Sequence, residues 1–141
     1  MLKRDYETQP FCGVARTLEV VGERWTLLIV RDAFLGKRRF EEFQESLGIA
    51  RNVLTDRLNR LVDEGVFERV RYSERPERYE YRLTPRGRDL LVALTALRQW
   101  GEKHAGGRPR TLRRRGDRRP VVAALVPEGT PALGLSDVTL R

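Results

Sequence analysis

Residues 51–60 place amide, methyl, carboxylate and guanidinium groups at the spacing of one helix face. If Leu54, Leu58, Leu61 and Val62 point into a core, that face is turned outward. An amide can pair with adenine, a methyl group with thymine, a carboxylate with cytosine, and a guanidinium with guanine or a phosphate. The residues on this face or at its edge are Arg51, Asn52, Val53, Thr55, Asp56, Arg57 and Arg60. The pattern predicts a surface that reads DNA.

The position of each residue along the helix predicts its role. Residues nearest the start of a recognition helix normally reach base edges. Those residues are Asn52, Val53, Asp56 and Arg57. Arg51 and Thr55 lie at the edge of the face and are better placed for phosphates. Phosphates would repel Asp56 unless it accepts a hydrogen bond from cytosine or pairs with Arg60, four residues further on, and we expect the pair.

The predicted reading helix is the second of two that span residues 39–65. In the first, Phe40, Phe43 and Leu47 follow a helical period, and Gly48 breaks the pattern directly after Leu47. Two amphipathic helices joined by a tight turn form a helix-turn-helix.

Two further helices are expected before this pair. Residues 13–21 form an amphipathic helix that Gly22 ends, and residues 25–34, apolar on nearly every face, form a core helix that Gly36 ends. A basic cluster follows at Lys37, Arg38 and Arg39, where cations and backbone N–H groups could hold a phosphate. The alternative is that these three side chains are simply solvated.

The pattern changes to that of strands after Gly65. Residues 66–72 and 79–83 are rich in β-branched and aromatic residues, and Pro76 lies between them. We expect a hairpin whose tip is residues 73–78, the wing of a winged helix. Arg75 and Arg78 are candidates for contact with the minor groove or its backbone, Arg75 more than Arg78.

A last long helix is predicted from Pro85, with Thr84 as its N-cap, to about His104. Its apolar face is wide for a terminal helix and needs a second surface to bury. We therefore expect a homodimer formed by the first and last helices, which suits palindromic half-sites. The expected contacts are Val14, Leu18, Leu90, Leu94, Leu97 and Trp100.

Charge and composition divide the chain of 141 residues, which carries a net charge of +8. Residues 105–141 hold 8 arginines and 3 acids, a net of +5, against 20 basic and 17 acidic residues, a net of +3, in residues 1–104. We expect an arm at 1–11, a mainly α winged helix-turn-helix domain with a small β-hairpin at 12–104, and a basic extension at 105–141. Residues 106–120 are too rich in Arg, Gly and Pro to pack, and residues 121–126 are β-like. The extension either attaches nonspecifically to DNA or is solvated.

Three stretches together resemble the HxlR-type family of bacterial winged-helix transcriptional regulators, from about Cys12 to Gly101. They are CGVARTLEVVGERWTLLIVRD, RFEEFQESLGIARNVLTDRLNRLVDEGVFER and YSERPERYEYRLTPRGRDL. The resemblance implies a dimeric DNA-binding regulator, more often a repressor, and in some members a response to oxidants or electrophiles through an N-terminal cysteine. The extension resembles an appendage of related actinobacterial sequences, but the cysteine pairs that flank it there are absent here, so we expect no metal.

Cys12 has two interpretations. The positive end of the first helix, with Arg16 one turn on, would favour a reactive thiolate at the position of the family's N-terminal cysteine. The alternative is a small residue packed near the dimer interface. Because Cys12 is the one cysteine in the chain, a sensor would have to be alkylated, capped by a small thiol, or joined to Cys12 of the other subunit.

Other classes of protein fit the sequence less well. The one histidine, His104, has no acid or nucleophile at a catalytic spacing, and no Gly-rich phosphate loop follows a strand, so we expect neither an enzyme nor a cofactor. No segment suits a membrane span or a signal peptide, which predicts a cytoplasmic protein. We expect a sequence-specific regulator that binds double-stranded DNA as a homodimer, open to an oxidant or small-molecule effector. The alternative is a winged-helix module that binds DNA or RNA nonspecifically or contacts proteins.

Overall fold

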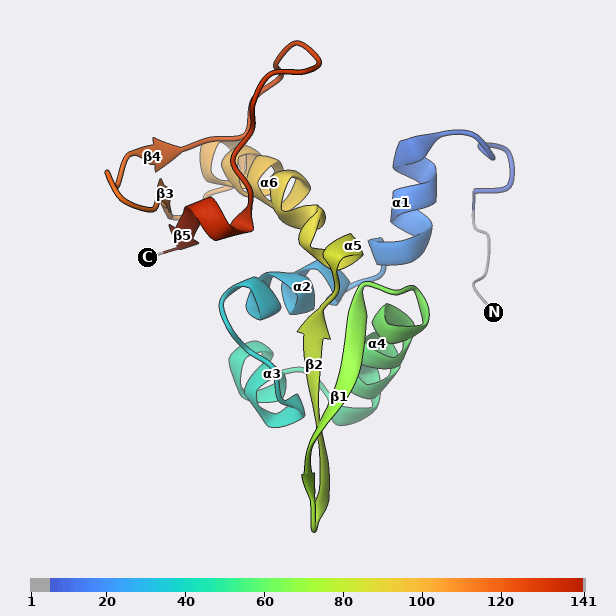
Figure 1. The fold of residues 1–141 in the computed structure, drawn as a ribbon. Coiled ribbons are helices and arrows are strands. Elements are labelled where there is room, and N and C mark those ends of the chain that lie inside the picture. Colours follow the sequence, from blue (N-terminus) through green and yellow to red (C-terminus); the bar gives the residue numbers. More distant parts are fainter. Residues whose placement is uncertain (1–5, 141) are drawn as a thin grey trace. The chain divides into compact units, whose positions relative to one another are not determined.

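The computed structural model describes residues 6–140 and divides into two compact units, the first ending at Gly87 and the second starting at Arg88. The helices of the first unit are α1 (Gly13–Val21), α2 (Thr26–Phe34), α3 (Phe40–Leu47) and α4 (Arg51–Asp63). The antiparallel strands β1 (Phe67–Glu74) and β2 (Glu77–Leu83) follow, and α5 (Pro85–Arg88) spans the boundary between the units. The hairpin projects beyond α2, α3 and α4 (Figure 1). This order confirms the predicted winged helix-turn-helix.

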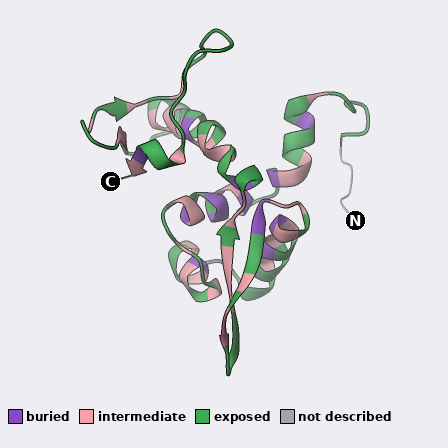
Figure 2. Ribbon diagram, in the orientation of Figure 1, coloured by how far each residue is buried: buried purple, intermediate pink, exposed green. Residues whose placement is uncertain are grey.

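The core of the first unit comes from the apolar positions that the helical periods indicated. Phe43, Leu54 and Leu58 have no exposed surface, and the rings of Phe43 and Phe67 lie 6.2 Å apart. Figure 2 shows the buried residues on α2, α3, α4 and the start of β1. Because Leu54, Leu58 and Leu61 face inward, the opposite face of α4 remains in solvent.

The two ends of the hairpin are joined through Thr84. Its backbone N–H donates to the Val66 carbonyl over 3.1 Å, and its hydroxyl accepts from the Gly87 N–H over 3.1 Å, which confirms the predicted N-cap. Gly87 is buried so close to Val66 that a Cβ there would lie 2.2 Å from the Val66 carbonyl oxygen. Only glycine fits this approach.

The expected single helix from Pro85 to about His104 is wrong. Helix α5 ends at Arg88, and a separate helix, α6 (Leu90–His104), begins after Asp89. The reason is tertiary, because the close approach of Gly87 to Val66 fixes α5 against the hairpin.

The expected wing tip at residues 73–78 is also wrong. Ser73 pairs with Arg78 and Glu74 with Glu77, so Arg75 and Pro76 alone form the turn. A two-residue connection is sufficient for antiparallel strands, and the ladder continues to the end.

The second unit contains α6 and a three-stranded antiparallel sheet in the order β4-β3-β5. The elements that follow α6 are β3 (Leu112–Arg114), β4 (Pro120–Val121), the 3-10 helix η1 (Leu135–Asp137) and β5 (Val138–Leu140). The prediction that residues 106–120 do not pack is therefore wrong, because Leu112 and Val138 supply a small buried core. In the predicted β-like segment 121–126, only Val121 belongs to a strand.

The irregular segment after β4 is held to α6 by one side chain. The Gln99 amide accepts from the Ala123 N–H over 2.7 Å and donates to the Ala123 carbonyl over 3.2 Å. A paired amide contact of this kind replaces the ladder that the segment lacks.

Gly87→Ala should lower the free energy of unfolding by about 1–3 kcal/mol, because the new methyl group must displace the Val66 carbonyl. Gly101→Ala is the matched control. A Cβ at Gly101, within α6, meets no atom within 4 Å, and the change should raise stability by about 0.5–1 kcal/mol. Urea unfolding at one fixed protein concentration measures both. Equal midpoints for the two variants would contradict the close approach.

Candidate nucleic-acid interface

The first two turns of α4 present polar groups to solvent. Arg51, Asn52, Thr55 and Asp56 are exposed and Val53 is half-buried. Ala50 caps the helix without a side-chain hydrogen bond, so the N–H groups of the first turn remain available to an anion. The Thr55 hydroxyl donates to the Arg51 carbonyl over 2.9 Å. This end of α4 therefore carries amide, methyl and cationic groups side by side.

Helix α3 positions the first cation of this surface. The Arg51 guanidinium stacks over the Phe40 ring at 4.7 Å, and its Nη1 donates to the Gln44 side-chain oxygen over 3.2 Å. A stacked guanidinium keeps donors free for a phosphate while losing little further side-chain entropy.

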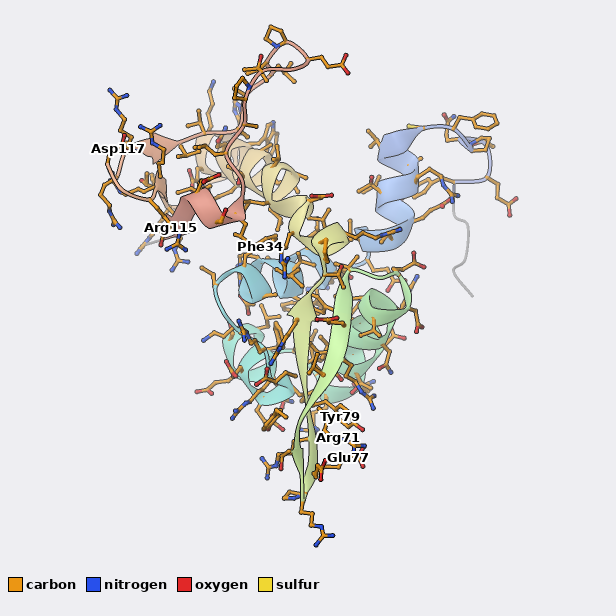
Figure 3. The ribbon with its side chains drawn as sticks, in the orientation of Figure 1. Phe34, Arg71, Glu77, Tyr79, Arg115 and Asp117 are labelled. Atoms are coloured by element: carbon orange, nitrogen blue, oxygen red, sulfur yellow. The ribbon has the colours of Figure 1, made fainter. Side chains whose placement is uncertain are left out.

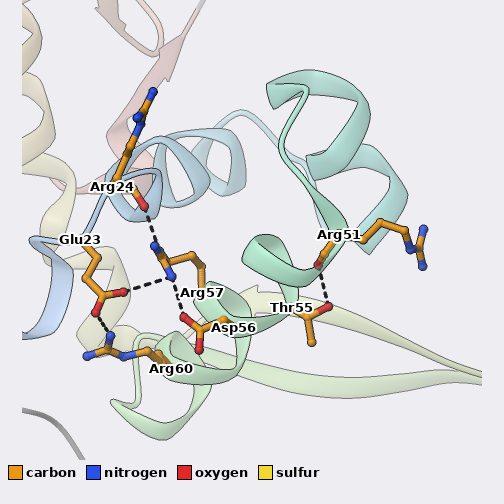
Figure 4. A network of polar contacts seen from close by, with 7 residues as sticks. All are labelled: Glu23, Arg24, Arg51, Thr55, Asp56, Arg57 and Arg60. Carbon is orange, nitrogen blue, oxygen red and sulfur yellow. Dashed lines mark hydrogen bonds and ion pairs between the residues drawn. The ribbon is translucent and has the colours of Figure 1, made fainter.

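The next two arginines of α4 are engaged by the turn between α1 and α2 (Figure 4). Arg57 Nε donates to the Arg24 carbonyl over 2.9 Å, and its Nη1 lies 3.2 Å from a Glu23 carboxylate oxygen and 2.6 Å from one of Asp56. Arg60 also pairs with Glu23. The side chains of Arg57 and Arg60 are 19% and 30% exposed. These contacts tie α4 to the start of α2.

The expected pair between Asp56 and Arg60 is wrong. Asp56 pairs with Arg57, its neighbour in sequence, because Glu23 holds the Arg60 guanidinium. Glu23 and Arg24 are positioning residues that the sequence analysis missed. They lie 33 residues or more before their partners, and no local spacing indicates such a contact.

The loop Lys37–Arg39 lies at the base of the wing. The Arg38 carbonyl accepts from the Tyr81 N–H over 2.7 Å, and the Arg39 guanidinium stacks over the Tyr72 ring at 4.3 Å. Arg38 and Arg39 are exposed. The hairpin therefore fixes where these two cations lie, a role for Tyr72 that the sequence did not indicate.

The wing presents two cations near its turn. Arg75 and Arg78 are exposed, and neither forms an ion pair within residues 6–140. Arg71 donates to Glu77 over 2.9 Å and to the Tyr79 hydroxyl over 3.2 Å. Figure 3 labels all three residues on the hairpin. Because Arg71 neutralises Glu77, that carboxylate weakens the field of the wing arginines less than an unpaired carboxylate would.

Cys12 forms the N-cap of α1. It is a half-buried free cysteine whose sulfur accepts from the Ala15 N–H over 3.5 Å. The Arg16 guanidinium, which was expected to act on Cys12, instead pairs with a Glu19 carboxylate oxygen at 2.8 Å.

The candidate dimer residues expose apolar surface. Val14 is 71% exposed and Leu18 41% on α1, while Leu97 is 54% and Trp100 63% exposed on α6. Leu90 and Leu94 are half-buried.

Within residues 6–140, no group of His, Cys, Asp and Glu could hold a metal ion, and no helix is long and apolar enough to cross a membrane.

Arg57→Met should lower the free energy of unfolding by about 1–2 kcal/mol, because it leaves the Arg24 carbonyl without its charge-assisted donor and removes one of the two cations that pair with Glu23. Arg51→Met, on the same helix but at an exposed contact, should cost about 0.5 kcal/mol or less. Thermal and urea unfolding would compare the two variants. Stability unchanged in Arg57→Met would show that the network does not hold α4.

The sequence matches the family model described as HxlR-like helix-turn-helix over residues 20–108. An uncharacterised HTH-type transcriptional regulator of Mycobacterium tuberculosis, Rv3095, is 57% identical over 92 residues, which are 65% of this chain and 58% of that protein. The chain thus aligns with little more than half the length of this relative.

Solved structures extend the similarity. The crystal structure of PA1607, titled as a candidate transcription factor, has a TM-score of 0.74 at 46% identity and covers 86% of this chain and 87% of that one. The reduced form of the redox regulator HypR has a TM-score of 0.63 at 33% identity, covering 67% and 94%. These relatives are named as regulators rather than enzymes, and the chain belongs to the HxlR-like helix-turn-helix family.

Proposed function

We propose that the protein is a sequence-specific transcriptional regulator that binds a palindromic operator in double-stranded DNA as a homodimer. The observation that carries the proposal is the exposed start of α4 within a winged helix-turn-helix, with Asn52 and Val53 outward and Arg51 stacked on Phe40. A helix presented in this way enters the major groove with its N-terminal residues at the base edges. Such a regulator would act in the bacterial cytoplasm, where its DNA lies.

Base reading and phosphate binding are divided among separate residues in this proposal. Asn52 suits adenine and Val53 a thymine methyl group. Phosphates would be held by Arg51 and Thr55, by the loop Lys37–Arg39, and, at the wing, by Arg75 and Arg78. Each of these cations belongs to the first unit of the chain.

The ion pairs change what we propose for the rest of α4. Asp56 is paired with Arg57, so its charge repels phosphates less than a lone carboxylate would. Arg57 and Arg60 would have to leave Glu23 to contact DNA. We therefore assign them first to holding α4 in place, with a phosphate contact as a secondary role.

The exposed apolar residues of α1 and α6 support a homodimer. Trp100 and Val14 together expose much of their surface in a single chain, which burial against a second copy would remove from water. A two-fold dimer presents two copies of α4 to two half-sites about one helical turn, or a multiple of it, apart. Binding over a promoter would repress transcription.

The alternative is a nonspecific basic module, and selectivity separates the two. A regulator should prefer its operator over random duplex by roughly 10³ or more. Footprinting on the DNA upstream of its own gene, followed by titration of the protected duplex and a scrambled one, measures this ratio. Equal affinity for both duplexes would replace the regulator with a nonspecific binder.

Asn52→Ala should weaken operator binding by about 1–3 kcal/mol and relax selection at one base pair per half-site. Asn59→Ala is the matched control, since Asn59 is exposed on the same helix two turns further from its start. It should change affinity by less than about 0.5 kcal/mol. Fluorescence anisotropy with operators mutated at each position checks both variants. A similar loss in the two would place the reading residues elsewhere on α4.

We also propose that Cys12 makes operator binding sensitive to oxidants or electrophiles. The proposal is supported by its N-cap position on a candidate dimer helix and by the similarity to HypR, which is named a redox regulator. With one cysteine per chain, the chemistry is alkylation, capping by a small thiol, or a disulfide between the two copies.

Cys12→Ser should leave operator affinity unchanged in reducing buffer, because serine can also cap α1. After treatment with diamide or a quinone, the wild-type protein should lose or change its DNA affinity, while the variant should not. Non-reducing electrophoresis and intact mass would identify the product at Cys12. If the variant responds as the wild-type protein does, Cys12 is not the sensor.

A further inference from the structure

The second unit carries the densest charge of the chain. Residues 108–119 contain seven arginines and one aspartate, a net of +6. The arginines are Arg108, Arg110, Arg113, Arg114, Arg115, Arg118 and Arg119. The last five lie on β3 and on the connection that leads to β4, called the basic turn below (residues 113–119). The family match ends at residue 108, so the basic turn lies beyond it.

The basic turn is a folded structure rather than a loose tail. The Asp117 carboxylate accepts from Arg114 Nε over 3.0 Å and from the Arg119 N–H over 3.1 Å, while Arg113 Nη1 donates to the Arg118 carbonyl over 2.9 Å. The Arg114 guanidinium, followed by the Arg119 N–H, lowers the pKa of Asp117 from 3.8 to about 2. Asp117 is therefore ionised at neutral pH and holds the turn closed.

The base of the turn is anchored in the small sheet. Strand β3 lies between β4 and β5, with Leu112 and Val138 buried. The Arg115 N–H donates to the Asp137 carbonyl over 2.7 Å. The positions of the arginines are therefore set by main-chain hydrogen bonds and a buried apolar contact.

Two side chains of the basic turn are exposed and have no polar partner among the described residues. Arg115 and Arg119 have no ion pair or side-chain hydrogen bond in the part of the chain that the structure describes (Figure 3 labels Arg115 and Asp117). Two carboxylates of the same unit already have partners, since Glu102 accepts from the Arg110 N–H over 2.9 Å and Asp137 from the Gly134 N–H over 2.8 Å. The guanidinium groups are thus available to an external anion.

We propose that the basic turn is a second DNA-contacting surface, which binds backbone phosphates of duplex DNA without reading sequence. This inference rests on the proposed function, because DNA is the polyanion that the same chain would hold through α4. Guanidinium groups match phosphate geometry, and a preformed turn loses less entropy on binding than a flexible basic tail would. Each phosphate contact adds about 0.9 to the slope of log affinity against log salt concentration.

The test compares the full-length protein with its Arg115→Gln/Arg119→Gln variant on operator and scrambled duplexes over a series of salt concentrations. The salt slope should fall by up to about 2 on both duplexes. The ratio of the two affinities should stay the same, because phosphates carry no sequence. Since both side chains are exposed, circular dichroism should match the wild-type spectrum, and Arg115→Lys/Arg119→Lys should retain most of the slope.

A matched control separates the effect of the basic turn on the salt slope from the effect of net charge. Arg108→Gln/Arg110→Gln removes the same charge from two exposed residues of the same unit, outside the turn, and should reduce the slope by less than half as much. An equal reduction in both double variants, or an unchanged slope in the first, would overturn the proposal. Arginine-dependent binding to single-stranded RNA that exceeds binding to duplex DNA would overturn it too. The wild-type protein could also show no preference for the operator while its salt slope still depends on Arg115 and Arg119. That result would refute the proposed regulator function and would still support the basic turn as a DNA contact.

Discussion

The contact between Phe43 of α3 and Phe67 of β1 is the constraint on which the first unit depends. Both side chains are essentially without exposed surface, and their rings lie 6.2 Å apart. Burying such a side chain stabilises the fold by about 1.5–3 kcal/mol, whereas an exposed ion pair contributes about 0.2–1 kcal/mol. The aromatic contact joins the helix-turn-helix to the wing, and the inward leucines of α4 complete the same core. The outward face of α4 is therefore a consequence of the core, not of the charges on that face.

The charges on that face determine which cations are left unpaired and can contact a partner. Glu23 engages Arg57 and Arg60, and Glu77 engages Arg71, so several arginines of a basic protein are neutralised within it. The exposed start of α4 is left with the uncharged Asn52 and Val53 beside a stacked Arg51. In the proposed function, selection and affinity would therefore come from different groups. A helix that reads mainly through an amide and a methyl group depends on cations elsewhere to hold it on DNA.

The sequence predicted the elements whose signals are local. The period of Phe40, Phe43 and Leu47 and the break at Gly48 were sufficient for the helix-turn-helix, and in the structure Gly48 is left-handed. Features set by distant contacts were missed. The break after α5 follows from the approach of Gly87 to Val66, and the pairing of Arg57 with Glu23 joins residues far apart in sequence. The packing of β3 was missed because its one buried apolar residue, Leu112, is followed by a run of arginines.

The same division between local and distant signals bears on how the extension would work. A disordered basic tail and a folded basic turn can have the same composition. They differ in how many of their cations have fixed positions before a partner binds. The Asp117 carboxylate accepts hydrogen bonds from Arg114 and from the Arg119 N–H. These bonds fix the direction of the backbone around Arg115 and Arg119. Asp117 therefore lowers the net positive charge by one but also fixes the positions of the arginines around it. A weak phosphate contact tethered to a reading helix gains from a high effective concentration, which raises affinity for every duplex alike. Selectivity would then remain a property of α4, and salt dependence a property shared with the second unit.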